Sequence, residues 1–97
     1  MNRYAIIETN SGYVWGVVNA QSALDACTEV DKAVGGRPGE GWYQTVPAGE
    51  WNTDRGYYDV RQAPEGFDVD DGQDREQIAA VNALPRVGMF QWIDEGN

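Results

Sequence analysis

Two short stretches of aromatic and β-branched residues open the chain before the pattern changes to a helical period. Residues 3–9 and 13–19 form these stretches, and Asn10, Ser11 and Gly12 separate them. Such a pattern predicts a β-hairpin with a short loop that contains glycine.

The next apolar residues recur at the spacing of one helix face. They are Ala23, Ala26, Cys27, Val30 and Ala33 or Val34. Ser22 and Asp25 form a start that resembles a capping box, and Gly35 with Gly36 marks the end. The pattern predicts a helix that directly follows the hairpin.

The second half of the chain repeats this order. Residues 42–46 and 57–62 favour two strands, joined by a long loop with breaker residues at both ends. Asp74 and Gln77 favour a second helix start, followed by a short apolar stripe that Pro85 ends. Residues 87–93 are apolar and aromatic, which favours a last strand.

The predicted order is two strands, a helix, two strands, a helix and a strand. We expect one α+β domain over residues 1–97, with a mainly antiparallel sheet of four to five strands. In this prediction both helices cover one face of the sheet, and the other face is open.

The charge of the chain indicates which kind of partner it can bind. The chain has 16 acidic and 7 basic residues, no histidine and a formal charge of -9. Repulsion disfavours direct binding to nucleic acid or to an anionic membrane. The expected partner is a basic nucleic-acid-binding protein or ribonucleoprotein complex of the host, although acidity also serves solubility alone.

The residue inventory gives catalysis little support. Without histidine, a general base would have to be a carboxylate, and no pattern singles one out. Cys27 lies on the apolar stripe of the first predicted helix, which favours a buried, inert thiol. No phosphate loop or dinucleotide motif is present. We therefore expect no enzymatic activity, no cofactor and no metal centre.

Residues 1–9 carry one arginine and a short apolar run. This favours neither a secretory signal nor a transmembrane span. The expected location is the cytoplasm of a bacterial host cell, and the expected state is a monomer or a small homo-oligomer.

An acidic segment, residues 65–76, is the main candidate for function. Its carboxylates, set against Arg75 alone, are Glu65, Asp68, Asp70, Asp71, Asp74 and Glu76. In an extended chain, Asp68 and Asp70 project to one side, about 6.6 to 6.8 Å apart, and imitate the charge density of DNA phosphates. The spacing does not fit an EF-hand. A solvated loop that leads into a helix cap, or an irregular weak cation site, is the alternative interpretation.

Aromatic side chains are the second candidate for function. Trp15, Trp42, Tyr57 and Trp92 are expected in the core. Trp51 lies in a polar loop, where it either folds back on the core or anchors a partner. Tyr58 neighbours Tyr57 in a predicted strand, so one ring of the pair should leave the covered face. Aromatic anchors beside carboxylates suit recognition of arginine-rich proteins.

The chain resembles the small acidic α+β proteins of phages known as type I anti-CRISPR proteins. The resemblance rests on the compact plan, on residues 4–7 (YAII), on residues 18–26 (VNAQSALDA), a strand running into an alanine-rich helix, and on the acidic segment. It implies a stoichiometric inhibitor that binds a CRISPR surveillance complex, or its nuclease, and blocks target DNA. The six carboxylates would steer association, and Trp51 and Tyr58 would anchor it. The alternative is an immunity protein or antitoxin that neutralises a basic nuclease toxin.

Overall fold

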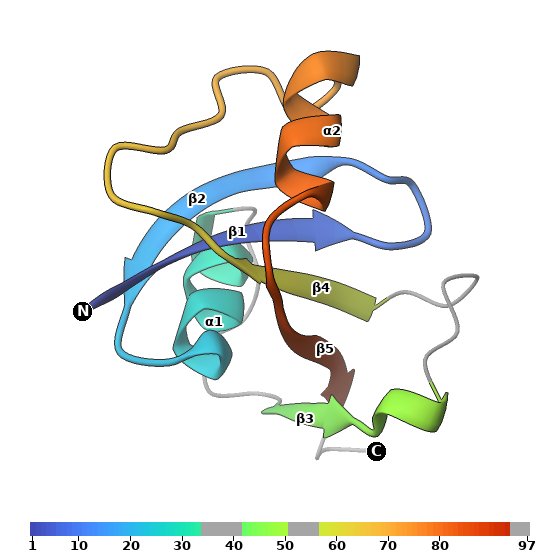
Figure 1. Cartoon of the computed structure of the whole chain (residues 1–97). Coiled ribbons are helices and arrows are strands. Elements are labelled where there is room, and N and C mark those ends of the chain that lie inside the picture. The colour runs from blue at the N-terminus through green and yellow to red at the C-terminus, as the bar shows by residue number, and fades with distance from the viewer. Residues whose placement is uncertain (34–41, 51–56, 94–97) are drawn as a thin grey trace.

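The secondary structure follows the predicted order, with one short 3₁₀ helix added. The computed structural model describes residues 1–33, 42–50 and 57–93. Its elements (Figure 1) are β1 (Asn2–Glu8), β2 (Val14–Ala20), α1 (Ala23–Ala33), β3 (Trp42–Val46), η1 (Ala48–Glu50), β4 (Tyr57–Gln62), α2 (Arg75–Asn82) and β5 (Arg86–Ile93). Among the described residues, no helix is long and apolar enough to cross a membrane.

One antiparallel sheet contains all five strands, in the order β2-β1-β4-β5-β3. Every neighbouring pair in it is antiparallel. The predicted α+β fold and its element order are therefore confirmed. Because β1 pairs with β2 on one side and with β4 on the other, the first strand of the chain is an interior strand, whereas β2 is an edge strand.

The interior strand β1 is buried on both of its faces. Tyr4 and Ile6 belong to one apolar cluster, together with residues of α1. Ala5 and Ile7 belong to a second cluster, to which residues of α2 contribute. Successive side chains of a strand point to opposite faces, so the two clusters lie on the two sides of the sheet.

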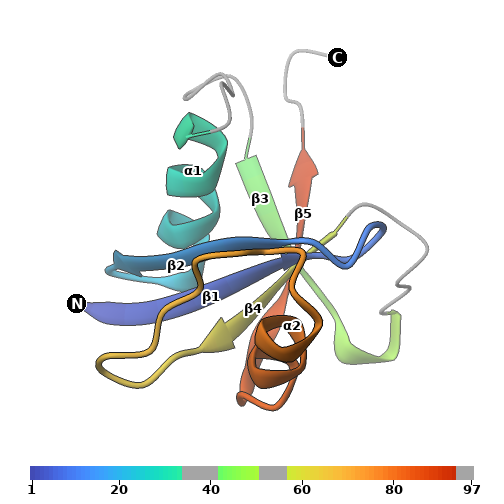
Figure 2. The ribbon, with the colours of Figure 1, turned by 90° about the horizontal axis from the view of Figure 1, so that it is seen from above.

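The two helices therefore cover opposite faces of the sheet (Figure 2). The prediction that both lie on one face, with the other face open, is wrong. Its physical reason lies in residues 4–7, because an uninterrupted apolar run is typical of a strand buried on both sides and requires a cover on each.

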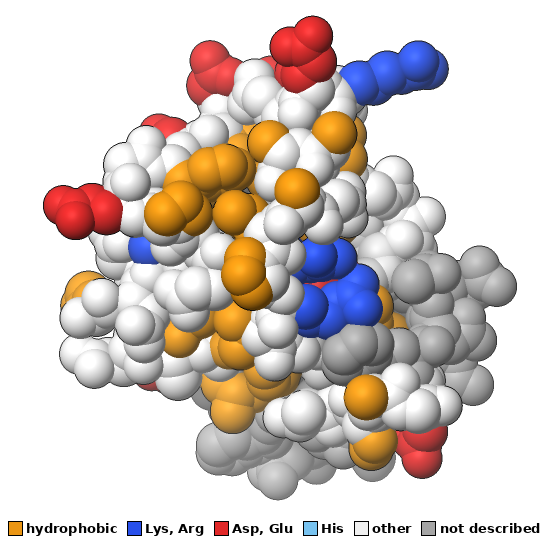
Figure 3. Space-filling model, viewed as in Figure 1, with side chains coloured by type: hydrophobic (Ala, Val, Ile, Leu, Met, Phe, Trp, Pro, Cys, Tyr) orange, Lys and Arg blue, Asp and Glu red, His pale blue; other side chains and the backbone are white. Residues whose placement is uncertain are grey.

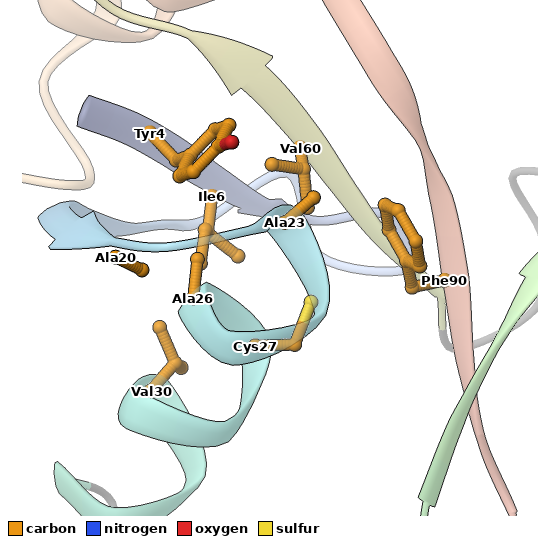
Figure 4. Close-up of a cluster of buried hydrophobic side chains, with 9 residues drawn as sticks. All are labelled: Tyr4, Ile6, Ala20, Ala23, Ala26, Cys27, Val30, Val60 and Phe90. Atoms are coloured by element: carbon orange, nitrogen blue, oxygen red, sulfur yellow. The ribbon is translucent and has the colours of Figure 1, made fainter. Parts of the chain in front are cut away.

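Helix α1 packs through the stripe that its sequence predicts. The Ser22 hydroxyl accepts a hydrogen bond from the Asp25 amide at 3.2 Å, which confirms the predicted cap. Ala26, Cys27 and Val30 point toward the strands (Figure 4). Cys27 is buried there, as its place on the stripe predicts.

A β-bulge interrupts the pairing of β1 with β2. Ile6 pairs with Gly16, and Ile7 pairs with Val14, so Trp15 is the extra residue on β2. Gly16 has φ +140°, a conformation that side chains other than glycine rarely adopt. A bulge of this kind redirects the side chain of the inserted residue.

A buried charged group joins the C-terminal end of α2 to the sheet. The Asp59 carboxylate accepts two hydrogen bonds from Arg61, at 3.2 and 3.0 Å, and two from Arg86, at 3.0 and 2.9 Å. The other end of the Arg61 guanidinium donates to the carbonyls of Asn82 and Leu84, at 2.9 and 2.8 Å. The Asn82 carbonyl belongs to the last residue of α2 and the Leu84 carbonyl lies two residues beyond it, where helical partners run out.

Asp59→Asn should destabilise the protein by about 3 kcal/mol, because two guanidinium groups then lose a buried carboxylate that accepts four hydrogen bonds from them. The Asp59 side chain is only 5% exposed, which limits compensation by water. Urea denaturation measures the change. Glu50→Gln, at an exposed position of η1, is the control and should stay within about 0.5 kcal/mol of the native protein. Equal stability of the two variants would contradict this role of Asp59.

Candidate functional site

The acidic segment joins β4 to α2 and crosses the sheet on the way. Figure 2 shows the chain before α2 running alongside β2. In Figure 3, acidic side chains project from the end of the molecule that α2 and this segment form. Glu65, Asp68, Asp70, Asp71 and Glu76 are exposed, and Asp74 is half-buried. The six predicted carboxylates thus belong to one continuous surface segment.

Burial alternates from Phe67 to Asp70. Phe67 and Val69 are half-buried and pack against the cluster under α2. Asp68 lies between these two residues and Asp70 follows them, and both are exposed. The Asp68 side chain is 74% exposed to solvent. The segment therefore presents an apolar side to the core and a carboxylate side to solvent.

Gln77 holds the backbone of the acidic segment in place. Its side-chain oxygen accepts hydrogen bonds from the amides of Asp70 and Asp71, at 2.9 and 3.2 Å. Its side-chain nitrogen donates to the Asp70 carboxylate. The backbone N–H of Gln77 in turn donates to the Asp74 carboxylate at 3.0 Å, which confirms Asp74 as the N-cap of α2. Helix and segment are thus linked by local polar contacts.

Gly72 attaches the segment to the edge strand. Its carbonyl accepts a hydrogen bond from the Val14 amide at 3.1 Å. A Cβ atom at this position would lie 2.0 Å from the Val14 carbonyl oxygen and 3.1 Å from a ring carbon of Tyr13. Only glycine fits such a close approach of two backbones.

Little of the segment's charge is neutralised by cations from the described residues. Arg3 donates to the Phe67 carbonyl at 2.8 Å and reaches Asp68 only at 3.9 Å. Two other arginines are bound to Asp59, and Lys32 pairs with Glu29 at 3.2 Å. Arg75 is exposed within the segment itself, one cation against six carboxylates. An exposed ion pair such as that of Arg3 contributes at most about 1 kcal/mol. The exposed side of the segment therefore remains strongly negative.

The aromatic candidates have a different distribution from the predicted one. Tyr57 is buried, as expected, and Tyr58 is half-buried against the cluster under α1. Since both faces are covered, neither ring of this pair lies on an open sheet face. Trp51 lies outside the described residues, as do the side chains of Trp42 and Trp92.

Trp15 is the exception to the predicted core. Its side chain is 37% exposed, because the bulge removes it from the alternation that would have directed it inward. Gly16 is the signal in the sequence from which this bulge could have been predicted, since a glycine inside a strand often marks a bulge.

The surface also contains a groove beside α1. A shallow groove of about 410 Å³ lies between the end of β2 and α1, lined by residues that include Asn19, Thr28 and Glu29. Among the described residues, no three Cys, Asp or Glu side chains come close enough together to hold a metal ion.

Gly72→Ala should destabilise the protein by about 1–3 kcal/mol, because the new methyl group overlaps the Val14 carbonyl and forces the two backbones apart. Thermal unfolding measures the cost. Gly49→Ala is the matched control, since a Cβ atom there meets nothing within 4 Å. If both substitutions change stability equally, the contact between the segment and β2 does not constrain the fold.

Comparison of this chain with protein-family models, with curated proteins and with solved structures finds no significant match.

Proposed function

We propose that this protein is a non-enzymatic inhibitor that occupies the nucleic-acid groove of a basic partner with its acidic segment. The observation that carries the proposal is the alternation of Phe67 and Val69 toward the core with Asp68 and Asp70 toward solvent. Carboxylates two residues apart in an extended chain repeat about every 6.6–6.8 Å, close to twice the 3.4 Å rise between phosphates of one DNA strand. A pair of carboxylates at this spacing, Asp68 and Asp70, suits a groove that binds every second phosphate.

Pre-organisation is the second support for the proposal. A flexible acidic tail loses conformational entropy when it binds, which weakens the complex. Here Gln77 binds the amides of Asp70 and Asp71, and Gly72 is bound to β2. The acidic segment therefore loses little conformational entropy when a partner binds it.

The resemblance to type I anti-CRISPR proteins directs the choice of partner to a CRISPR surveillance complex. Its positively charged channel holds the guide RNA and the target DNA strand. An acidic protein in that channel would block target DNA by occupancy alone. The same surface chemistry suits an immunity protein that covers a basic nuclease toxin, so this candidate is the other outcome to be tested.

A triple variant, Asp68→Asn, Asp70→Asn and Asp71→Asn, should need about a tenfold higher concentration to displace target DNA, because it loses the charge that steers association. Asparagine keeps an oxygen acceptor at each position, so the hydrogen bonds to Gln77 and Gln73 persist. The assay measures release of a labelled DNA duplex from a purified type I surveillance complex.

The matched control carries the same total charge. It combines Asp25→Asn, Glu29→Gln and Glu50→Gln, three exposed positions on α1 and η1, and should inhibit within about twofold of the native protein. Equal weakening of both triple variants would mean that net charge acts rather than the acidic segment. A native protein that leaves the DNA bound would rule out this target, and inhibition of a basic nuclease instead would support the immunity role.

Gln77→Ala tests the pre-organisation separately, because it keeps all six carboxylates. The variant should inhibit about three- to tenfold less well, since the segment must then be ordered on binding. The same DNA-release assay measures the loss. Ala79→Gln, at an exposed position of α2, is the control for helix substitutions. Undiminished inhibition by Gln77→Ala would show that charge suffices without a fixed backbone.

A further inference from the structure

The bulge in the β1–β2 hairpin brings Trp15 beside a carboxylate at the surface. The Trp15 ring nitrogen donates to Glu8 Oε2 at 3.1 Å, and the Ser11 hydroxyl donates to Glu8 Oε1 at 3.2 Å. A carboxylate offers about four lone-pair sites, so each Glu8 oxygen can accept a further hydrogen bond. Trp15 and Glu8 thus combine an aromatic surface with a negative charge.

The hairpin loop fixes this pair in position. The Glu8 amide donates to the Tyr13 carbonyl, and the Gly12 amide donates to the Glu8 carbonyl, both at 2.8 Å. The Tyr13 amide donates to the Ser11 hydroxyl at 3.2 Å. These bonds fix the backbone of the loop through both the N–H and the carbonyl of Glu8. The Glu8 carboxylate and the Trp15 ring are therefore held in place before a partner binds.

Tyr13 connects Trp15 with the acidic segment. The Tyr13 and Trp15 rings meet edge to face, with centroids 4.9 Å apart and an interplanar angle of 76°. Tyr13 also lies close to Gly72, since a ring carbon is 3.1 Å from the position of a Cβ atom at that residue. The aromatic pair therefore borders the backbone of the acidic segment at Gly72.

We propose that Trp15, Glu8 and Tyr13 bind an arginine side chain of the partner protein. This inference rests on the proposed function, because it identifies the residue that the partner contributes at the border of the acidic segment. Tryptophan is the ring that cations prefer, and a planar guanidinium can stack on it while its N–H groups donate to a carboxylate. The net charge of -9 and the neighbouring carboxylates select a cation over a neutral ligand.

Lysine is the informative comparison. Its ammonium group carries the same charge, but it is compact, more strongly hydrated and unable to stack as a plane. A site built from charge alone treats the two cations alike, whereas a ring beside a carboxylate favours arginine. The preference for arginine thus reports on Trp15, and the total affinity reports on the acidic segment.

The test compares an arginine homopeptide with a lysine homopeptide of equal length, titrated into the isotopically labelled protein and followed by NMR. The arginine peptide should bind about two- to fivefold more tightly and should shift the Trp15 indole N–H resonance, which is assigned by its loss in Trp15→Phe. Trp15→Leu should abolish the preference while leaving the affinity for the lysine peptide unchanged. Trp15→Phe, which keeps a ring, should retain most of it.

Leu24→Ala serves as the control, since Leu24 is exposed to a similar extent on α1. It should keep the full preference for arginine. Equal binding of the two peptides, with no shift of the Trp15 resonance, would overturn the arginine site. Loss of the preference in Trp15→Leu but not in Trp15→Phe, with full affinity in the triple Asp68, Asp70 and Asp71 variant, would support the site and contradict the proposed role of the acidic segment.

Discussion

Burial of β1 on both faces is the constraint on which the rest of this structure depends. A strand with Tyr4 and Ile6 on one side and Ala5 and Ile7 on the other needs an apolar cover on each side. Helix α1 follows the hairpin directly and provides one cover. The other comes from α2, which lies far along the chain after β4, and the segment between β4 and α2 reaches the β2 edge, where Gly72 accepts a hydrogen bond from Val14. The position of the acidic segment is thus a consequence of how the core is closed.

Helix α2 is short, and its packing and end contacts hold it in place. A helix of eight residues is marginal in isolation, because nucleation is unfavourable. Asp74 caps its N-terminus, and Arg61 binds the Asn82 and Leu84 carbonyls at its C-terminal end while Asp59 compensates the guanidinium charge. The same helix supplies Gln77 to the acidic segment. The buried charged group therefore contributes to the surface indirectly, through the position of α2.

Local patterns in the sequence predict most of the fold. The hairpin at Asn10 to Gly12, the stripe of α1 and the cap at Asp74 each depend on residues within a few positions of one another. Contacts between distant residues are not predictable in this way. Asp59 and Arg61 are near neighbours, but Arg86 meets them only because β5 pairs with β4.

The same difference between local patterns and distant contacts explains why only part of the candidate site is predictable from the sequence. Exposure of Asp68 and Asp70 follows from the alternation with Phe67 and Val69, which the sequence contains. Trp15 is predicted in the core because large rings supply much of the burial in a small sheet. The bulge opposite Ile6 and Ile7 shifts the register by one residue and leaves the ring exposed. The contact of Gln77 with Asp70 and Asp71 depends on how the chain turns before α2, which no spacing rule specifies.

The functional account requires the acidic segment to be a fixed surface rather than a solvated loop. Amide hydrogen exchange of the free protein tests this most directly at Val14, Asp70 and Asp71, whose amides donate to Gly72 and Gln77. The account predicts that these three amides exchange at least about tenfold more slowly than in an unstructured peptide of the same sequence. Exchange at the rate of the unstructured peptide would contradict it.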